Sequence, residues 1–317
     1  MRNTVKCGSD AAVKRSFSER VRNDFKNNKI IYLIMLPMIV YYIVFCYFPM
    51  YGAIIAFKDY SPAEGIFASP WVGVEHFRNF FSNPDFVRIL RNTLTISISE
   101  LIFGFPAPII LALLFNEIRC RKFKSIAQTI SYLPHFISLV VVCSLIKQFV
   151  TGNGVIQQLI EAAGGSNVSL LSRAEMFVPL YVISGIWQDV GWGTIIYLAA
   201  LSGIDQELYE AATVDGANKF KQMLNITLPG IAPTIIIMFI LKVGTLLSVG
   251  YEKIILLYNP LIYETSDVIS SYVYRIGIQN QSWSYSTAVG LFNSVINFII
   301  VIAANKLSAK FSETSLW

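Results

Sequence analysis

Long apolar runs with almost no charge constrain this chain more than any other feature of its sequence. Six stretches reach the roughly 20 residues that a helix needs to cross a bilayer core: 30–57, 93–115, 126–146, 177–201, 231–250 and 285–304. Only 14% of the 317 residues are charged, against about a quarter in soluble proteins. A transmembrane barrel would instead show repeated ten-residue segments of alternating polarity. We therefore predict an all-α integral membrane protein with six transmembrane helices.

Basic residues near the ends of these runs predict the orientation of the chain. They concentrate after the second, fourth and sixth runs: Arg119, Arg121, Lys122, Lys124, Lys219, Lys221, Lys306 and Lys310. Connections rich in Lys and Arg stay on the cytoplasmic side, so both termini are expected there. The first run is too long for a cleaved signal peptide. The expected division is a basic cytoplasmic segment (1–29), a transmembrane domain (30–310) and a cytoplasmic tail (311–317).

Several classes of protein are disfavoured by the sequence. The net charge of +5 comes largely from residues beside the apolar runs, which indicates membrane topology and not nucleic-acid binding. The cysteines (Cys7, Cys46, Cys120 and Cys143) and histidines (His76 and His135) show no metal-ligand spacing. We find no glycine-rich ATP-binding loop and no catalytic constellation. The sequence thus predicts a protein that is not an enzyme and binds no metal or cofactor itself.

The polar connection between the fourth and fifth runs, residues 202–230, has the pattern of a helix–turn–helix. Asp205 is a good N-cap, and Leu208, Ala211 and Ala212 fall on one small apolar face. Gly216 can end this helix in a left-handed conformation. The pattern fits a helix that seats in a groove on another protein. An amphipathic loop resting on lipid headgroups fits it equally well.

The same connection carries a recognisable motif. Glu210-Ala211-Ala212, then Gly216 after three residues, then Ile226-x-Leu228-Pro229 after nine more, resembles the EAA signature of binding-protein-dependent ABC importer permeases. The stretches 51–60 (YGAIIAFKDY), 191–205 (GWGTIIYLAALSGID) and 252–277 are similar to the carbohydrate-uptake branch of that family. They are most similar to its LplB-like permeases for complex oligosaccharides.

The resemblance implies a transport subunit of the bacterial cell membrane. In such a subunit the cytoplasmic EAA helix, between spans four and five, docks into a separate ATPase that uses ATP and Mg²⁺. Glu210 would be its polar anchor and Gly216 its turn, with Ala211, Ala212, Asp215, Ile226, Leu228 and Pro229 completing the coupling segment. The implied partners are a second permease subunit, two copies of the ABC ATPase, an extracellular solute-binding protein and an oligosaccharide substrate. The first outer connection, 58–88, is either a docking surface for the binding protein or a plain connector.

Polar residues inside the spans are the candidates for the substrate path, because an ionisable group at bilayer depth is costly and normally faces protein or water. Asp189 and Lys242 would either pair with each other or line a hydrated pathway. The remaining candidates are Trp187, Trp192, Tyr197, Tyr251, Glu252, Asn293 and Asn297. The aromatic ones are either sugar platforms or interfacial anchors. Asn293 and Asn297 are either path residues or interhelical hydrogen-bonding groups, and Glu252, next to Lys253, is either at the outer mouth or on a solvated loop edge.

The sequence therefore predicts the permease subunit of an ATP-driven importer, most consistent with oligosaccharides or polysaccharide fragments. If Lys242 faces the path, an acidic sugar is favoured. The alternative is a self-sufficient secondary transporter or channel, which would work without partners. That alternative gives the EAA segment no role.

Overall fold

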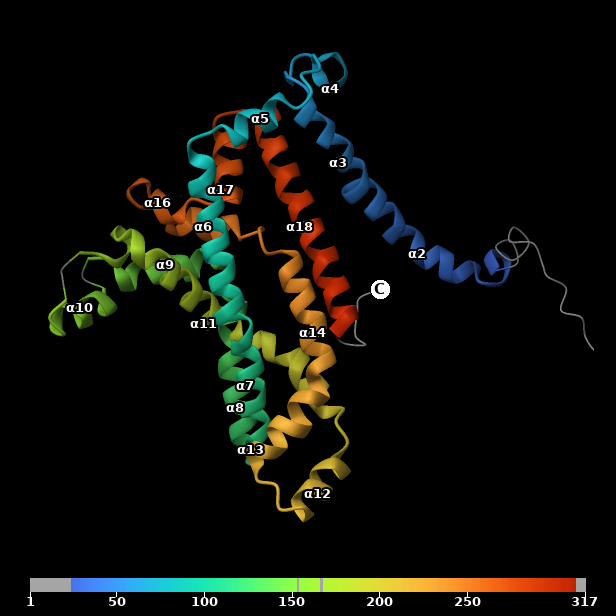
Figure 1. Ribbon diagram of the computed structural model, residues 1–317, viewed down its shortest axis with the longest axis vertical. Coiled ribbons are helices and arrows are strands. Elements are labelled where there is room, and N and C mark those ends of the chain that lie inside the picture. The colour runs from blue at the N-terminus through green and yellow to red at the C-terminus, as the bar shows by residue number, and fades with distance from the viewer. Residues whose placement is uncertain (1–23, 153, 166–167, 312–317) are drawn as a thin grey trace, which may run out of the picture. The chain divides into compact units, whose positions relative to one another are not determined.

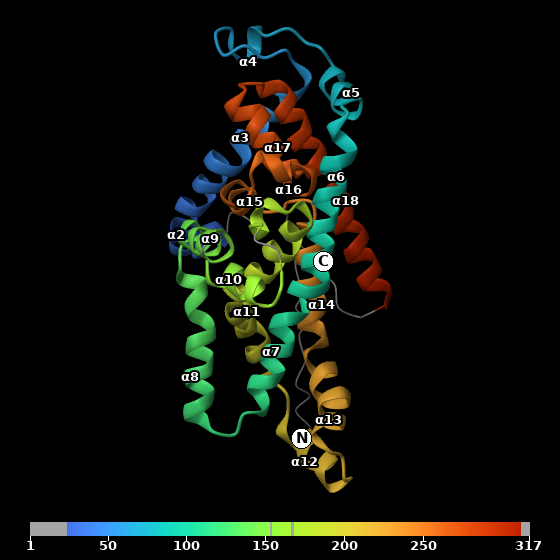
Figure 2. The ribbon, with the colours of Figure 1, turned by 90° about the vertical axis from the view of Figure 1, so that its left-hand side faces the viewer.

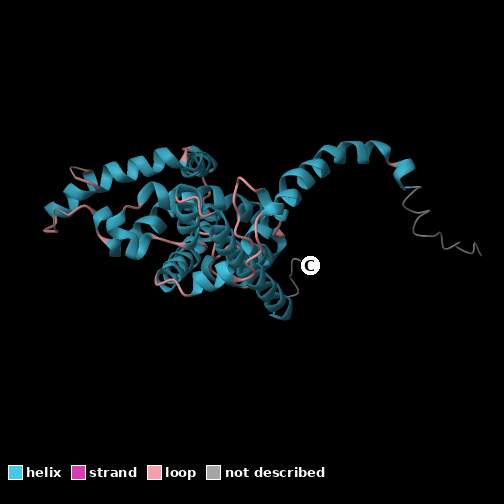
Figure 3. Ribbon diagram, turned by 90° about the horizontal axis from the view of Figure 1, so that it is seen from above, coloured by secondary structure: helices cyan, strands magenta, loops and turns pink. Residues whose placement is uncertain are grey.

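The computed structural model describes residues 24–152, 154–165 and 168–311, and throughout them the chain is helical (Figures 1 and 3). Within these residues the sole β-type pairing is an isolated bridge between Lys58 and Trp71. Cys7, most of the basic segment 1–29 and nearly all of the tail 311–317 lie outside the described residues. The predicted all-α class is confirmed.

The chain divides into two compact units, Met1–Ile54 and Ile55–Trp317. The first contains α2 (Lys29–Tyr41), the π-helical η1 (Tyr42–Tyr47) and α3 (Phe48–Met50). None of the residues in these three helices is buried, although most are apolar. A helix that is apolar on all sides is stable only when lipid or protein covers it.

Five helical stretches in the described residues are long and apolar enough to cross a membrane. They are Lys29–Phe57, Asp85–Glu117, Leu139–Ala162, Lys219–Gly244 and Trp283–Lys310. Four of them overlap a predicted span closely. The fourth predicted span, 177–201, forms a single helix, α11 (Phe177–Ser202), that is not among these five stretches. Its centre contains Gln188, Asp189 and several glycines, which lower its hydropathy.

The predicted span 126–146 is divided in the structure. Residues 121–132 form α8 (Arg121–Tyr132), a 3-10 turn follows in η4 (Leu133–Phe136), and α9 (Leu139–Val150) begins after it. Pro134 lies in the turn and supplies no backbone N–H for a continuing helix. Ser138 then caps α9 by accepting a hydrogen bond from the N–H of Val141. Hydropathy does not register this break, because every residue around it except His135 is apolar or small.

The second unit is built around α11. It contacts α6 (Asp85–Ser99), α7 (Pro106–Glu117), α8 and α14 (Leu228–Gly244). A π-helical turn, η3 (Glu100–Gly104), joins α6 to α7, where Pro106 removes a backbone donor. The close approach of α11 to α8 depends on Gly191, since a Cβ there would overlap the carbonyl of Ser131.

Two groups of elements lie at opposite ends of this unit (Figure 2). At one end are α4 (Gly65–Ala68), α5 (Glu75–Phe81) and α17 (Ile269–Tyr274), with η9 (Arg275–Gln279) leading to α18 (Trp283–Phe311). At the opposite end are α12 (Gln206–Val214), α13 (Lys219–Gln222) and the π-helical η7 (Met223–Thr227). Short elements complete the chain: η2 (Tyr51–Phe57), α10 (Val155–Ala162), η5 (Leu170–Ser172), η6 (Ala174–Met176), α15 (Tyr251–Leu257), η8 (Pro260–Ile262) and α16 (Tyr263–Ser266).

Candidate functional site

A cavity of about 320 Å³ lies between η3, α7, α11 and α14. Three of the predicted path residues line it: Asp189, Tyr197 and Lys242. Its other walls are largely apolar or small, with Phe105, Pro108, Val182, Gly185, Ile186, Gly193, Met238 and Leu241 among them. A cavity that combines apolar walls with a few polar groups has the composition of a small-molecule site.

The two charged residues predicted for the path, Lys242 and Asp189, each pair with another residue. Lys242 Nζ lies 3.1 Å from Glu100 Oε2, on the π-helical turn η3. Asp189 Oδ1 lies 2.9 Å from His135 Nδ1. Lys242 and Asp189 therefore do not pair with each other, and both line this cavity. Glu100 and His135 were missed, although each interrupts an apolar run in the sequence.

His135 also connects the cavity wall to an aromatic group. Its ring stacks on Trp192, with 4.6 Å between centroids and an interplanar angle of 4°. Trp192 does not line the cavity, and 46% of it is exposed. Trp187, 49% exposed, also lies outside the lining. The candidate aromatic platforms therefore divide into Tyr197 in the cavity and the two tryptophans outside it.

The outer candidates Tyr251 and Glu252 lie on α15, outside the cavity lining. The Tyr251 hydroxyl donates to Glu252 Oε1 at 3.5 Å, and its ring stacks on Tyr274 with 5.8 Å between centroids. Glu252 is exposed, as a loop-edge residue would be. The adjacent Lys253, which a solvated edge would also expose, is in fact buried, with 7% of its surface accessible.

Lys253 is held by one residue of α11. Its ammonium donates to the Tyr181 carbonyl oxygen at 2.8 Å and lies 4.5 Å from the centroid of the Tyr181 ring. Burial lowers the pKa of Lys253 to about 8, while the charge of Glu100 acts in the opposite direction. Sequence reasoning did not select this lysine, because its buried position depends on how α15 folds back against α11.

Asn297 serves the contacts of α18 with the segment that follows α14. Its Oδ1 accepts from the Leu247 N–H at 3.0 Å, and its Nδ2 donates to Ser248 Oγ at 2.9 Å. Asn297 therefore hydrogen-bonds to neighbouring protein groups, but its partners Leu247 and Ser248 lie in the non-helical segment after α14 and not in another helix. The Oδ1 of Asn293 is buried with no hydrogen-bond partner among the described residues. Neither asparagine lines the cavity.

The segment 202–230 has the local structure that its sequence predicts. The Asp205 carboxylate accepts the N–H of Glu207 at 3.0 Å and caps α12. Gly216 follows the helix with a φ of +74°, and the Ala217 N–H donates to the Ala212 carbonyl at 2.9 Å. This is the pairing of a glycine-terminated helix. Asn218 then caps α13 by accepting the N–H of Lys221 at 2.9 Å.

Side chains brace this segment while leaving an apolar surface open. The Tyr209 hydroxyl lies 3.0 Å from Thr227 Oγ1, and Gln222 Nε2 donates to Thr213 Oγ1 at 3.0 Å. Glu210 is exposed, and so are three large apolar residues of the same segment: Leu208, Val214 and Phe220. Exposed apolar side chains gathered on one segment are typical of a protein-binding surface.

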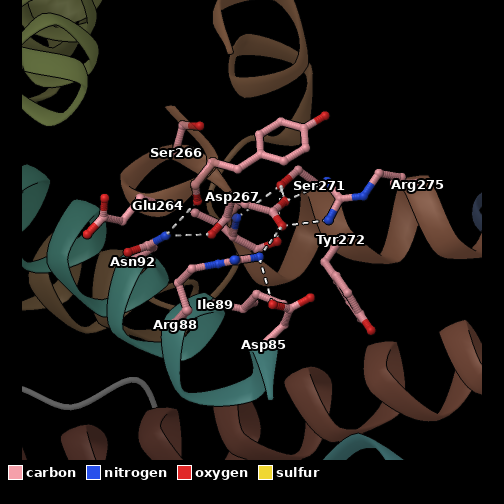
Figure 4. Close-up of polar contacts among 12 residues, drawn as sticks. Asp85, Arg88, Ile89, Asn92, Glu264, Ser266, Asp267, Ser271, Tyr272 and Arg275 are labelled. Carbon is pink, nitrogen blue, oxygen red and sulfur yellow. Dashed lines mark hydrogen bonds and ion pairs between the residues drawn. The ribbon is translucent and has the colours of Figure 1, made fainter. Parts of the chain in front are cut away.

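At the other end of the unit, a buried carboxylate joins three elements (Figure 4). Asp267 has no accessible surface and accepts two hydrogen bonds from Arg275, at 3.0 and 2.6 Å. Ser271 Oγ donates to it at 2.9 Å, and Arg88 of α6 lies 3.7 Å away. The Asn92 amide donates to its backbone carbonyl at 3.0 Å.

We name these contacts the Asp267 cluster. Burial and hydrogen bonds shift the pKa values of Arg275, which belongs to it, and of the neighbouring Tyr272. Burial alone would lower the pKa of Arg275, but the hydrogen bonds and charge of Asp267 raise it above its usual value. Burial and the hydrogen bond with Tyr285 raise the pKa of Tyr272. Both groups therefore keep their usual protonation across physiological pH, and the cluster is a permanent ionic link.

Comparisons with known proteins agree on one class. A family model described as "Binding-protein-dependent transport system inner membrane component" matches residues 104–313. Protein LplB of Bacillus subtilis (strain 168) is 47% identical over 92% of both chains. The polygalacturonan/rhamnogalacturonan transport system permease protein YteP of the same organism is 43% identical over 97% of both. A chain from the crystal structure of a bacterial alginate ABC transporter, in complex with an alginate pentasaccharide-bound periplasmic protein, superimposes with a TM-score of 0.86. That chain is 41% identical, and the match covers 94% of this chain and all of that one.

Proposed function

The chain belongs to the family of binding-protein-dependent transport system inner membrane components, and on that premise we propose how it works and what it carries. It is a non-catalytic permease subunit of a carbohydrate ABC importer and a multi-pass membrane protein. The proposed cargo is an acidic oligosaccharide. Support comes from the relative named for polygalacturonan and rhamnogalacturonan and from a second structural relative, described as importing the acidic polysaccharide alginate.

The proposed topology has six spans with both termini in the cytoplasm of a bacterial cell. The fourth of these spans, added to the five long apolar stretches, is α11, whose 26 residues extend about 39 Å at the usual helical rise. The cytoplasmic end would then be the one that contains α12, and the outer end the one that contains α5 and α17. The basic connections around Arg121 and Lys221 support this orientation, and so does the distribution of elements in Figure 2. The proposed division remains 1–29, 30–310 and 311–317.

The proposed energy input is through α12 and the segment that follows it. Two copies of a partner ATPase would bind ATP and Mg²⁺. The helix α12 would dock into this ATPase, with Glu210 as its polar anchor and with Ala211 and Ala212 allowing close approach. Gly216 would set the turn, with Asp215 beside it, and Ile226, Leu228 and Pro229 would transmit the movement into α14. The exposed apolar side chains of this segment support this assignment, since a subunit interface would cover them.

The proposed substrate path runs through the cavity lined by Asp189, Tyr197 and Lys242. A second, homologous permease subunit would supply the facing half of the path, and an extracellular solute-binding protein would deliver the sugar at the outer end. Trp192 would act through His135, and Trp187, Tyr251, Glu252 and Asn293 are proposed contacts outside the cavity. Asn297 is proposed to hold α18 in place.

Co-purification from detergent-solubilised native membranes tests the coupling role of α12. Glu210→Ala removes the proposed anchor, and Glu207→Ala, an equally exposed change on the same helix, is the matched control. We expect the wild type and Glu207→Ala to retain an ATPase and a second permease subunit. The Glu210→Ala variant should retain the second permease. The amount of ATPase that co-purifies with it should fall about tenfold or more, as expected for a central interface residue. Equal ATPase recovery with all three proteins would contradict the proposed coupling.

A further inference from the structure

Two lysines lie near the cavity, and they differ in how their charge is balanced. Lys242 projects into it but is neutralised by Glu100 at 3.1 Å. Lys253 lies outside the lining, and among the described residues no carboxylate oxygen lies within 4.0 Å of its ammonium. Its ammonium instead donates to the neutral carbonyl of Tyr181 and lies over the aromatic ring of the same residue. A buried charge with no opposite charge in contact is costly.

Gly185 separates this ammonium from the cavity. Gly185 lines the cavity, and a Cβ built on it would lie 3.2 Å from Lys253 Nζ. Any larger residue at this position would therefore place carbon between the ammonium and a ligand in the cavity. Gly185 is on α11, one turn from Tyr181, which fixes the lysine. The ammonium therefore lies directly behind a backbone position that lines the cavity.

The electrostatic field in the cavity follows from this arrangement. Glu100 and Lys242 largely cancel as a close pair, and the Asp189 side chain is 63% exposed and paired with His135. Charges that remain exposed are screened by water, whereas a buried charge acts at a lower effective dielectric. Lys253 is the buried one, so the wall formed by Gly185 is the positive side of the cavity.

We propose that Gly185 and Lys253 form a carboxylate-binding subsite, in which the uronic-acid carboxylate of a passing sugar lies against Gly185 and is attracted by the buried ammonium. This inference rests on the proposed import function. It differs from the expectation based on Lys242, because the charge of Lys242 is already balanced. Lys253 thus determines preference for acidic over neutral sugars, and Asp189 opposes it.

Uptake by the complete transporter in proteoliposomes tests the subsite. The two probes are trigalacturonate and its neutral methyl ester, offered with the same binding protein throughout, so that its own selectivity cancels between variants. Lys253→Met removes the charge and keeps the apolar stem, and Lys253→Arg keeps the charge. We expect the ratio of acid to ester uptake to fall about tenfold in Lys253→Met and to stay within about twofold of wild type in Lys253→Arg. Gly185→Ala should lower the ratio by a smaller factor.

The outcomes separate this inference from the import function. Asp189→Asn should raise the acid-to-ester ratio, which a purely structural role for Lys253 would not predict. If wild type takes up the acid and Lys253→Met lowers both probes equally or neither, the subsite is wrong and import stands. If wild type takes up neither probe, import of acidic sugars and the subsite are both overturned. The yield of assembled complex is measured for each variant. A variant that loses uptake but assembles normally has lost transport and not folding.

Discussion

Single glycines on α11 control how closely its neighbours approach. Gly191 allows the Ser131 carbonyl to reach the helix, and Gly193 faces the Pro108 ring, 2.9 Å from where its Cβ would be. Gly185 faces the Lys253 ammonium. Glycine normally weakens a helix interior by about 1 kcal/mol relative to alanine. Three glycines in nine residues are therefore explained by contacts and not by helix propensity.

Substitution of Gly191 by alanine tests this explanation. Although alanine is the better helix former, its Cβ would overlap the Ser131 carbonyl, and forced overpacking typically costs about 1–3 kcal/mol. We expect Gly191→Ala to lower the melting temperature of the detergent-solubilised protein, followed by tryptophan emission. The matched control is Gly290→Ala on α18, where the Cβ would meet nothing within 4 Å, so the melting temperature should be unchanged or higher. A stabilised Gly191→Ala protein would contradict the close crossing.

At the scale of elements, the Asp267 cluster holds α6 against α16 and α17. The carboxylate is completely buried, and its partners come from both sides of the contact. Removing one partner of a buried ion pair leaves the other charge without compensation, which is more costly than the pair is stabilising.

Asp267→Asn should therefore destabilise this end of the unit strongly, by about 3–5 kcal/mol. Asp85→Asn is the control, because Asp85 pairs with Arg88 at 3.0 Å but its side chain is 42% exposed, and exposed pairs contribute about 1 kcal/mol or less. Hydrogen exchange of α17, measured by mass spectrometry, should accelerate in Asp267→Asn and remain near wild type in Asp85→Asn. Equal protection in both variants would show that the cluster does not hold these elements together.

Local features of the elements could be predicted from the sequence, whereas long-range pairing could not. The Asp205 cap and the Gly216 turn depend on residues within one helical turn, so their pattern is sufficient. The pairing of Lys242 with Glu100 joins residues far apart in the chain, and hydropathy holds no information about which helices are neighbours. The break near Pro134 was hidden because apolar residues continue through it. Burial of Lys253 depends on the fold of α15 against α11 and has no sequence signal.

At the scale of the whole molecule, the second unit combines three features in a fixed order. A braced helix with exposed apolar side chains lies at one end, a cavity with charged groups lies in the body, and an ion-linked cluster lies at the other end (Figure 2). Since α14 leads directly from η7 to the wall of the cavity, a displacement of α12 has a short helical route to this cavity. This connection is the physical basis of the proposed coupling.

ATP-driven uptake of an acidic oligosaccharide tests the central claim most directly. Proteoliposomes would contain this chain with its co-purified permease partner and ATPase, with the binding protein outside and ATP inside. We predict accumulation of trigalacturonate that requires ATP, the binding protein and this chain together. Uptake of the same sugar by this chain alone, driven by an ion gradient without ATP, would contradict the account and support a secondary transporter.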